Sequence, residues 1–268
     1  MKITSPQNPR IKYLKRLSEK ESFRKKERKF ILEGPSFINH LFERDYTPES
    51  IVTCPDFSGD VSMILKKAEE RKVPVIEVNS ICYSKFSSVK SPQGVASVVP
   101  FPNYEPEKIL KNSEGVFLVA DGLQDPGNLG TLIRTCDAAG ANGLITLPPS
   151  ASFYNPKTVR SSAGSVVNIP ILEMSEEKLI NLCEQFKINI YGAVPRKGSD
   201  LRKIKFNRPL CIIVGSESHG ISSSLMQHCR PVAIPMRFGV ESLNASVAGA
   251  LFLYSVQYGV SNGEGKLS

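Results

Sequence analysis

Three short segments combine glycines with small polar and charged residues, a composition typical of ligand-binding loops. The first, 121–130, contains Asn128 and continues into a stretch that carries Arg134. Its glycines allow close approach of the backbone, and a helix that starts near Asn128 would offer free N–H groups to an anion. The segment has neither the G-x-G-x-x-G spacing of dinucleotide-binding loops nor the lysine of a P-loop. Apolar periodicity along 129–136 puts Arg134 on the polar side of that helix, where an arginine is ordinarily solvated.

The second segment, 215–220, places Glu217 among serines and glycines directly after the apolar run 210–214. A carboxylate in this setting belongs either to a turn or to the edge of a binding site. A nucleophile elbow needs a glycine two residues away on each side of its serine. Neither serine of this segment has both, so the spacing argues against a hydrolase. His219 alone is expected to form loop hydrogen bonds and not to act as a catalytic base.

The third segment, 234–246, joins an apolar run to the last long apolar stretch of the chain. Ser242 or Asn244 can cap a final helix over 243–258. Apolar side chains surround most of that helix. We therefore expect it to be buried on more than one side, in the core and at a subunit interface.

Apolar runs alternate with helical periodicity, which predicts an α/β protein with helices packed on sheets. In the amino-terminal part we expect helices over 5–30, 36–44 and 61–71 and strands over 50–53, 73–78 and 94–99. In the carboxy-terminal part we expect strands over 116–119, 144–147, 188–193, 210–214 and 232–234, with helices over 129–139, 155–163, 176–186, 223–228 and 243–258. This second sheet should be largely parallel and covered on both faces. Ligands bind beyond the carboxyl ends of such strands, which is where the three segments lie.

The prolines of 100–106 interrupt both periodicities. We therefore expect two domains, 1–100 and 113–268, joined by a linker over 101–112. No stretch reaches the roughly 18 apolar residues of a membrane span, and the amino terminus lacks a signal-peptide core. The protein is expected in the cytoplasm, away from membranes. The six cysteines have no C-x-x-C spacing and the three histidines are dispersed, so no metal site is predicted.

Positive charge is concentrated at the amino terminus. Residues 1–29 hold eleven Lys and Arg against three Glu, which accounts for the whole formal net charge of +8. The remaining residues are balanced, so we expect a neutral body with a basic arm. Such an arm is either a solvated helix face or a surface for a polyanion, and phosphate is the obvious polyanion.

Taken in order, the three segments resemble the signature motifs of the SpoU (TrmH) branch of the knotted SPOUT methyltransferases. The residues that carry the resemblance are 128–130 with Arg134, 214–217 with Gly220, and 234–236 with 242–246. Two segments of the amino-terminal part, 30–34 and 91–95, resemble the substrate-binding domain that precedes many SpoU catalytic domains, and 155–164 resembles a further SpoU segment. The resemblance covers nearly the whole chain.

The resemblance implies a small amino-terminal α/β RNA-binding domain and a SPOUT catalytic domain with a parallel sheet and a deep trefoil knot. It also implies a homodimer that moves a methyl group from S-adenosylmethionine to a ribose 2′-hydroxyl of RNA, in sites that draw residues from both subunits. The implied catalytic residues are Asn128, Arg134, Glu217, Ser242 and Asn244. The implied cofactor-binding residues are Val214, Gly215, Gly220, Ile234, Met236, Leu243 and Ser246. Basic residues expected to contact RNA are Arg10, Lys12, Lys15, Arg24, Lys25, Arg28, Lys157 and Arg160.

A ribose hydroxyl is a poor nucleophile, so catalysis must remove its proton or stabilise the oxygen as charge develops. The family resemblance makes Arg134 the deprotonating group, yet a guanidinium stays protonated at neutral pH. We hypothesise that Arg134 binds the target phosphate and stabilises the developing oxyanion. A separate amino-terminal domain resembles ribosomal RNA modifiers more than minimal transfer RNA enzymes. A tRNA ribose methyltransferase, a base methyltransferase and a non-catalytic RNA-binding protein remain alternatives.

Overall fold

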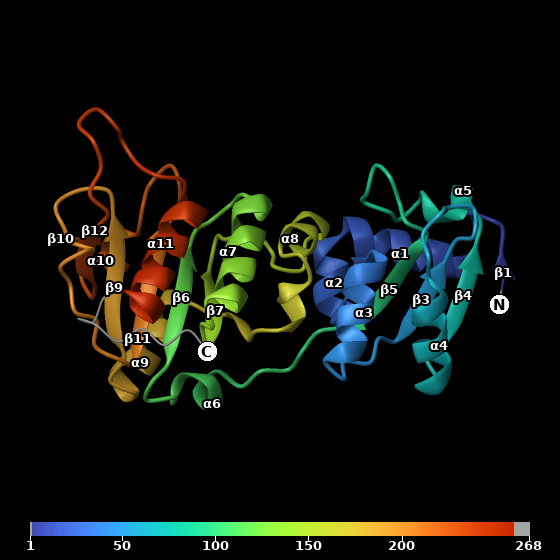
Figure 1. The fold of residues 1–268 in the computed structure, drawn as a ribbon, viewed down its shortest axis with the longest axis horizontal. Coiled ribbons are helices and arrows are strands. Elements are labelled where there is room, and N and C mark those ends of the chain that lie inside the picture. Colours follow the sequence, from blue (N-terminus) through green and yellow to red (C-terminus); the bar gives the residue numbers. More distant parts are fainter. Residues whose placement is uncertain (1, 260–268) are drawn as a thin grey trace. The chain divides into compact units, whose positions relative to one another are not determined.

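The computed structural model describes residues 2–259, which form two compact units (Figure 1). The first unit runs to Pro102 and includes a returning segment, Tyr154–Asn168. The second comprises Asn103–Phe153 and the chain from Ile169 onward. The division expected from the sequence is linear and assigns the returning segment to the second domain. The end of that expected domain, 260–268, lies outside the described residues.

The first unit is built on a five-stranded sheet in the order β1-β4-β3-β5-β2. β1, β4 and β3 are parallel, whereas β5 runs antiparallel to both of its neighbours. The strands are β1 (Lys2–Ile3), β2 (Lys29–Glu33), β3 (Ser50–Thr53), β4 (Val75–Val78) and β5 (Val95–Pro100). The helices are α1 (Pro9–Glu19), α2 (Glu21–Glu27), α3 (Pro35–Glu43), α4 (Ser62–Glu70), α5 (Ser80–Tyr83) and α8 (Pro156–Ser161).

The basic segment is not the single helix expected over 5–30. Lys20 has an extended backbone that separates α1 from α2, and the apolar residues from Phe30 onward enter the sheet as β2. The apolar side of α1 is buried in the same cluster as residues of β3 and β4, through Ile11, Leu14 and Leu17. The segment is therefore a packed layer of the first unit and not an arm, because its apolar stripe needs cover from the sheet.

The returning segment is held to the rest of the first unit by aromatic and polar contacts. The Tyr154 ring stacks on Phe101 with a centroid distance of 3.8 Å and on Phe30 with a distance of 4.6 Å. Further along, the Arg160 guanidinium donates to the backbone carbonyl of Ser88 at 2.9 Å.

The second unit contains a seven-stranded sheet in the order β10-β12-β9-β11-β6-β7-β8, and every pairing in it is parallel. The strands are β6 (Val116–Asp121), β7 (Gly143–Leu147), β8 (Ile171–Glu173), β9 (Asn189–Val194), β10 (Ser199–Asp200), β11 (Leu210–Gly215) and β12 (Arg230–Ala233). The helices are α6 (Pro106–Leu110), α7 (Pro126–Ala138), α9 (Glu176–Gln185), α10 (Ser223–Met226) and α11 (Ala245–Tyr258).

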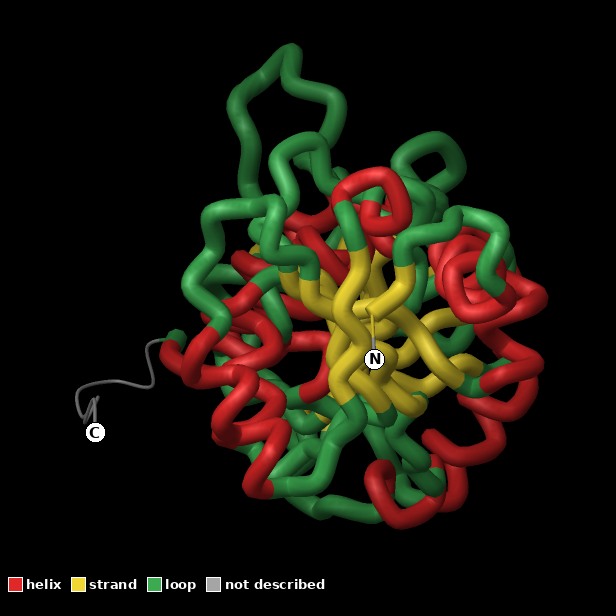
Figure 2. Tube along the Cα trace, turned by 90° about the vertical axis from the view of Figure 1, so that its right-hand side faces the viewer, coloured by secondary structure: helices red, strands yellow, loops and turns green. Residues whose placement is uncertain are grey.

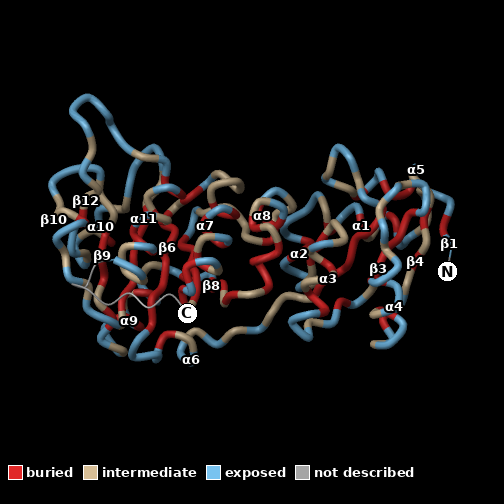
Figure 3. Tube along the Cα trace, in the orientation of Figure 1, coloured by how far each residue is buried: buried red, intermediate tan, exposed pale blue. Residues whose placement is uncertain are grey.

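Helices cover both faces of this sheet (Figure 2), and its central strands β6, β7 and β11 are buried between them (Figure 3). Phe117 and Val119 of β6 share an apolar cluster with residues of α6 and α9. Leu118, between them in sequence, points to the opposite face, where α11 and α7 pack. A Cβ added at Gly249 of α11 would lie 2.5 Å from a methyl carbon of Leu132 in α7, so the glycine permits this close packing.

The predicted α/β class with a covered parallel sheet is confirmed. The trefoil knot stays a prediction. No helix in the described part of the chain is long and apolar enough to cross a membrane.

Candidate active site

Four loops meet at the carboxyl ends of adjacent parallel strands in the second unit. They follow β6, β11, β9 and β12, which lie side by side in the sheet. Because these strands are parallel and adjacent, the loops at their carboxyl ends bring together residues that are far apart in sequence. Ligands of α/β proteins bind at this edge of the sheet.

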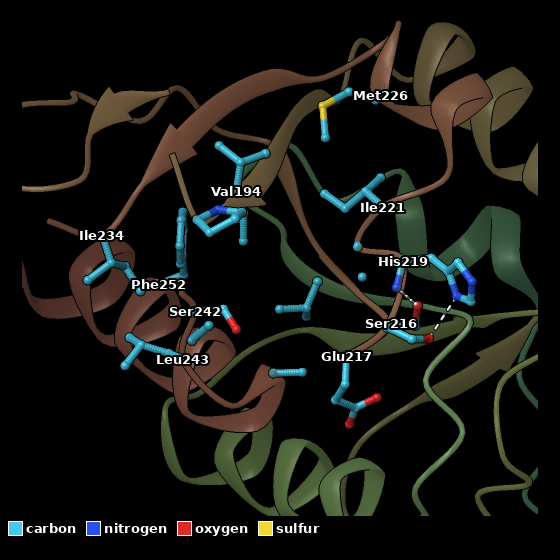
Figure 4. A pocket seen from close by; sticks show the side chains of 18 of the residues that line it. Val194, Ser216, Glu217, His219, Ile221, Met226, Ile234, Ser242, Leu243 and Phe252 are labelled. Atoms are coloured by element: carbon cyan, nitrogen blue, oxygen red, sulfur yellow. Dashed lines mark hydrogen bonds between the residues drawn. The ribbon is translucent and has the colours of Figure 1, made fainter. Parts of the chain in front are cut away.

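A cavity of about 460 Å³ lies among the loops after β9, β11 and β12 and the start of α11 (Figure 4). Its apolar walls include Val194, Ile234, Leu243 and Phe252, and Glu217 stands at one side. The volume falls within the roughly 300–1,000 Å³ of small-molecule sites, which are mostly apolar with a few polar groups. A nucleoside-sized cofactor such as S-adenosylmethionine fits these dimensions and this lining.

Most of the residues implied as cofactor-binding line this cavity: Val214, Gly215, Gly220, Ile234, Met236 and Leu243. Ser246 does not line it and is buried in α11 instead. Sequence reasoning missed the wall formed by Ala193, Val194 and Pro195, at the end of β9. The signal was present, because the strand expected over 188–193 must also point its carboxyl end at the site.

The loop after β11 is a tight turn closed on itself. Ser216 and Gly220 exchange two backbone hydrogen bonds, of 3.1 and 2.9 Å. A Cβ at Gly215 would lie 2.0 Å from the carbonyl carbon of Gly220, so only glycine allows this approach. His219 donates its backbone N–H to the Ser216 hydroxyl, and its ring hydrogen-bonds Ser218 at 2.7 Å, as expected of a loop residue. The turn holds Glu217 at its exposed tip.

Residues from all three motifs form one hydrogen-bonded cluster. The Asn128 amide donates to the Glu217 carboxylate and accepts from the Asn244 amide at 3.0 Å. Asn244 also caps α11, since its side-chain oxygen accepts the backbone N–H groups of Ser246 at 2.9 Å and Val247 at 3.3 Å. The Ser246 hydroxyl donates to the same oxygen at 2.6 Å. The helix cap and the polar cluster thus share one side chain.

Two further implied catalytic residues lie outside this cluster. Ser242 lines the cavity. Arg134 is exposed, does not line the cavity, and has no hydrogen bond or ion pair to another residue in 2–259. It follows Asn128 by six positions on α7, which is about 9 Å along the helix axis and roughly 240° around it. Arg134 therefore points away from the cluster of its own chain.

Asp121 is a buried carboxylate that sequence reasoning did not single out. It is 7 % exposed at the end of β6 and accepts the backbone N–H of Ser222 at 2.7 Å. The Ser222 hydroxyl donates to Glu176 at 3.0 Å. These bonds fix the end of the Glu217 turn, so Asp121 is a positioning residue.

The basic residues expected to contact RNA are in different environments. Arg24 is 3 % exposed, and its guanidinium donates to the carbonyls of Leu17 at 2.9 Å and Ser18 at 3.0 Å, at the end of α1. Burial lowers the pKa of this guanidinium. The expectation of RNA contact is therefore corrected for Arg24, which is a structural residue. The others are exposed: Arg10, Lys12, Lys15, Lys25, Arg28, Lys157 and Arg160.

Comparisons with known proteins agree with this architecture. Residues 115–254 match the SpoU rRNA Methylase family, and residues 8–97 match the MRM3-like substrate binding domain. The chain is 31 % identical to the 23S rRNA (guanosine(2553)-2′-O)-methyltransferase RlmP of Bacillus subtilis, over 95 % of this chain and 98 % of that protein.

Solved structures are similar over nearly the full length. An AdoMet-bound rRNA methyltransferase from Sinorhizobium meliloti has a TM-score of 0.86 at 27 % identity and covers 96 % of this chain and 97 % of its own. AviRb from Streptomyces viridochromogenes, a SpoU methyltransferase solved with AdoMet, has a TM-score of 0.83 at 25 % identity, over 93 % of this chain and 97 % of its own. These matches confirm the resemblance drawn from the three motifs. The chain belongs to the SpoU rRNA Methylase family.

Proposed function

We propose that this protein transfers the methyl group of S-adenosylmethionine to a ribose 2′-hydroxyl of ribosomal RNA. The observation that carries the proposal is the cluster of Asn128, Glu217 and Asn244 beside the 460 Å³ cavity. The site therefore combines a small-molecule cavity with polar groups that can orient a second substrate.

The cavity residues are suited to hold the cofactor. Backbone groups near Gly215 can meet its polar atoms, and Ile234, Met236 and Leu243 can cover its apolar surface. When bound, S-adenosylmethionine supplies a methyl group on a sulfonium and leaves as a neutral thioether.

Polar residues of the chain can orient the ribose 2′-hydroxyl. Glu217 and Asn128 offer acceptors and donors next to the cavity, which can fix the ribose in line with the methyl group. The hydrogen bonds from Asn128 and Asn244 restrain these side chains before the RNA arrives, so less conformational entropy is lost on binding.

We infer that the active form is a homodimer. Four apolar side chains at spacings of four, three and four form an exposed stripe on α11: Val247, Leu251, Tyr254 and Tyr258. Such a stripe is typical of a helix that packs against another helix. Arg134 is exposed on α7, which packs beside α11. A second copy on this face would receive Arg134 near its own site, where a guanidinium can bind a phosphate and stabilise the developing oxyanion.

Ribosomal RNA is the favoured substrate because RlmP of Bacillus subtilis, which matches this chain end to end, is named for a 23S rRNA nucleotide. The exposed cations on α1 and α2 can add phosphate contacts. Ribosomal RNA would place the activity in the cytoplasm. Transfer RNA remains the second candidate, since relatives such as the one from Staphylococcus saprophyticus are named tRNA/rRNA methyltransferases.

Two measurements test the proposal. Purified protein with methyl-tritiated cofactor should label ribosomal RNA, and ribose analysis should find the label on a 2′-oxygen. Mapping of 2′-O-methyl nucleotides in strains with and without the gene should show one ribosomal position lost. Label on a base, on transfer RNA alone, or on no RNA would contradict the proposal.

A further inference from the structure

The loop between β12 and α11, residues 234–244, presents an aromatic side chain to solvent. Phe238 has a relative exposure of 106 %, more than any other large apolar side chain in the described part of the chain. Figure 1 shows this loop standing out from the second unit, and Figure 3 shows its tip exposed. Single exposed apolar residues are common on proteins, so exposure alone assigns no role. The position of the loop beside the cavity is what suggests a role for this side chain.

Both ends of the loop line the cavity, through Ile234 and Met236 on one side and Ser242 and Leu243 on the other. Phe238 lies midway between these ends. Gly239 follows with φ +89°, a left-handed conformation that turns the chain back toward α11. The loop that carries the ring therefore begins and ends at the cavity, although Phe238 itself does not line it.

Basic residues lie next to the tip of the loop, one through a hydrogen bond and others through the sequence. The Arg196 guanidinium, exposed after β9, donates to the Val240 carbonyl at 3.1 Å and ties the loop to the segment that lines the cavity through Pro195. Lys197 follows Arg196 and Arg237 precedes Phe238 in the sequence; both are exposed, as is the acidic Glu241. An aromatic ring among cations suits a nucleic acid better than an apolar protein surface, because phosphates need the charge and unpaired bases need the ring.

We propose that Phe238 stacks on an unpaired base of the RNA substrate, next to the nucleotide whose ribose enters the site. The proposal rests on the proposed function and adds a specificity-determining residue to it. Proteins that read single-stranded RNA stack bases on aromatic side chains, and the contact tolerates every base because each has a π-face. The stack requires the target nucleotide to lie in an unpaired region, so Phe238 selects for RNA conformation.

A tryptophan reporter tests the contact directly. The chain contains no tryptophan, so Phe238→Trp would introduce the sole indole. A short single-stranded oligoribonucleotide should quench its fluorescence in a saturable way. The control is His228→Trp, which places the indole at an exposed position before β12, at the opposite end of that strand. Its fluorescence should not change.

Two other occupants of this surface give different results. Quenching by S-adenosylmethionine alone would mean that the loop closes over the cofactor. A fluorescence change on diluting the protein without RNA would mean that the ring packs against a second copy of the chain. Either result would overturn the stacking proposal.

Kinetic variants test whether a planar ring is needed. Phe238→Tyr should keep the KM for RNA, whereas Phe238→Leu and Phe238→Ala should raise it about tenfold or more. Cofactor affinity and Tm should not change, because the ring is exposed. A leucine variant with the original KM would refute stacking, since apolar volume would suffice. If RNA quenches the reporter but the unmodified protein methylates no RNA, the proposed function fails while the stacking contact stands.

Discussion

The Asn128 side chain uses both ends of its amide, donating to Glu217 and accepting from Asn244. A carboxylate of the same size at position 128 would face Glu217 with like charge, and an apolar side chain would remove both hydrogen bonds. An amide at this position makes both contacts at once. Glu217 has two separable properties: its carboxylate accepts the hydrogen bond from Asn128, and it carries a negative charge.

Variants of Glu217 separate these two roles. Glu217→Ala should lower kcat/KM for methyl transfer about 10- to 100-fold, because the Asn128 donor loses a charged partner. Glu217→Gln keeps an acceptor and should lose much less. Cofactor affinity, measured by calorimetry, should be similar in both. An equal loss in the two variants would show that the charge itself is required.

Arg24 and Arg10 form a matched pair of arginines, one buried and one exposed. Arg24→Ala should destabilise the fold by about 1–3 kcal/mol, because two carbonyls at the end of α1 lose their donor. Arg10→Ala should leave Tm unchanged and reduce the salt dependence of RNA binding by about one phosphate contact. Thermal unfolding and RNA titrations at several salt concentrations check both. Reversed effects would reject the assignment of Arg24 as structural.

At the scale of elements, the turn after β11 determines how Glu217 is presented. Its closure depends on the contact between Gly215 and Gly220 and on the anchoring of Ser222 by Asp121. The same backbone lines the cavity, so one element serves both the cofactor and the polar cluster. A change in the turn should therefore affect binding and catalysis together.

Gly215→Ala tests this dependence. The added methyl group would clash with Gly220, so we expect a loss of about 1–3 kcal/mol in stability and a much weaker cofactor affinity. Gly140→Ala is the control, because its φ of +69° imposes strain but its nearest neighbour is 3.9 Å away. It should cost stability alone. Unfolding and cofactor titration distinguish the two variants, and unaltered binding in Gly215→Ala would contradict the assigned role of the turn.

Sequence patterns predicted those elements whose apolar period is clear. The strands of the parallel sheet that contain long apolar runs, such as β11, fall where expected, and Asn244, one of the two residues expected to cap the last helix, caps α11. β2 was missed because it begins within a run of charged residues, and its burial depends on pairing with β5, far along the chain. The burial of Arg24 could not be predicted either, because nothing in a run of basic residues shows which of them will donate to backbone carbonyls in the fold. Val194 and Pro195 could have been predicted, because ligands bind at the carboxyl ends of parallel strands. No local pattern shows, however, that these two residues line the cavity.

At the scale of the whole molecule, the proposed homodimer would make the site of a single chain incomplete, because Arg134 is exposed on α7 and points away from the cluster of its own chain. Pairing two copies would both cover the stripe and supply the guanidinium. Catalysis would then require the dimer, because each site would use residues of both subunits.

Mixing two inactive variants tests this dependence. Arg134→Ala and Asn128→Ala should each be nearly inactive alone. If a site combines Arg134 of one subunit with Asn128 of the other, unfolding and refolding them together should restore about a quarter of the original activity, because half of the dimers would have one intact site. No recovery, with dimers verified by ultracentrifugation, would show that each site is built within one chain.

The returning segment has a consequence for how such a protein can be recombined. The backbone passes between the two units three times, after Pro102, Phe153 and Asn168, and Tyr154 depends on Phe30 and Phe101 for its cover. Neither unit is one continuous segment of the chain, so neither can be exchanged at a single junction. A gene fusion that exchanges only residues 1–102 would leave Tyr154 and α8 against a foreign surface. A chimera with new RNA preference would have to inherit 154–168 from the same parent as its amino-terminal half.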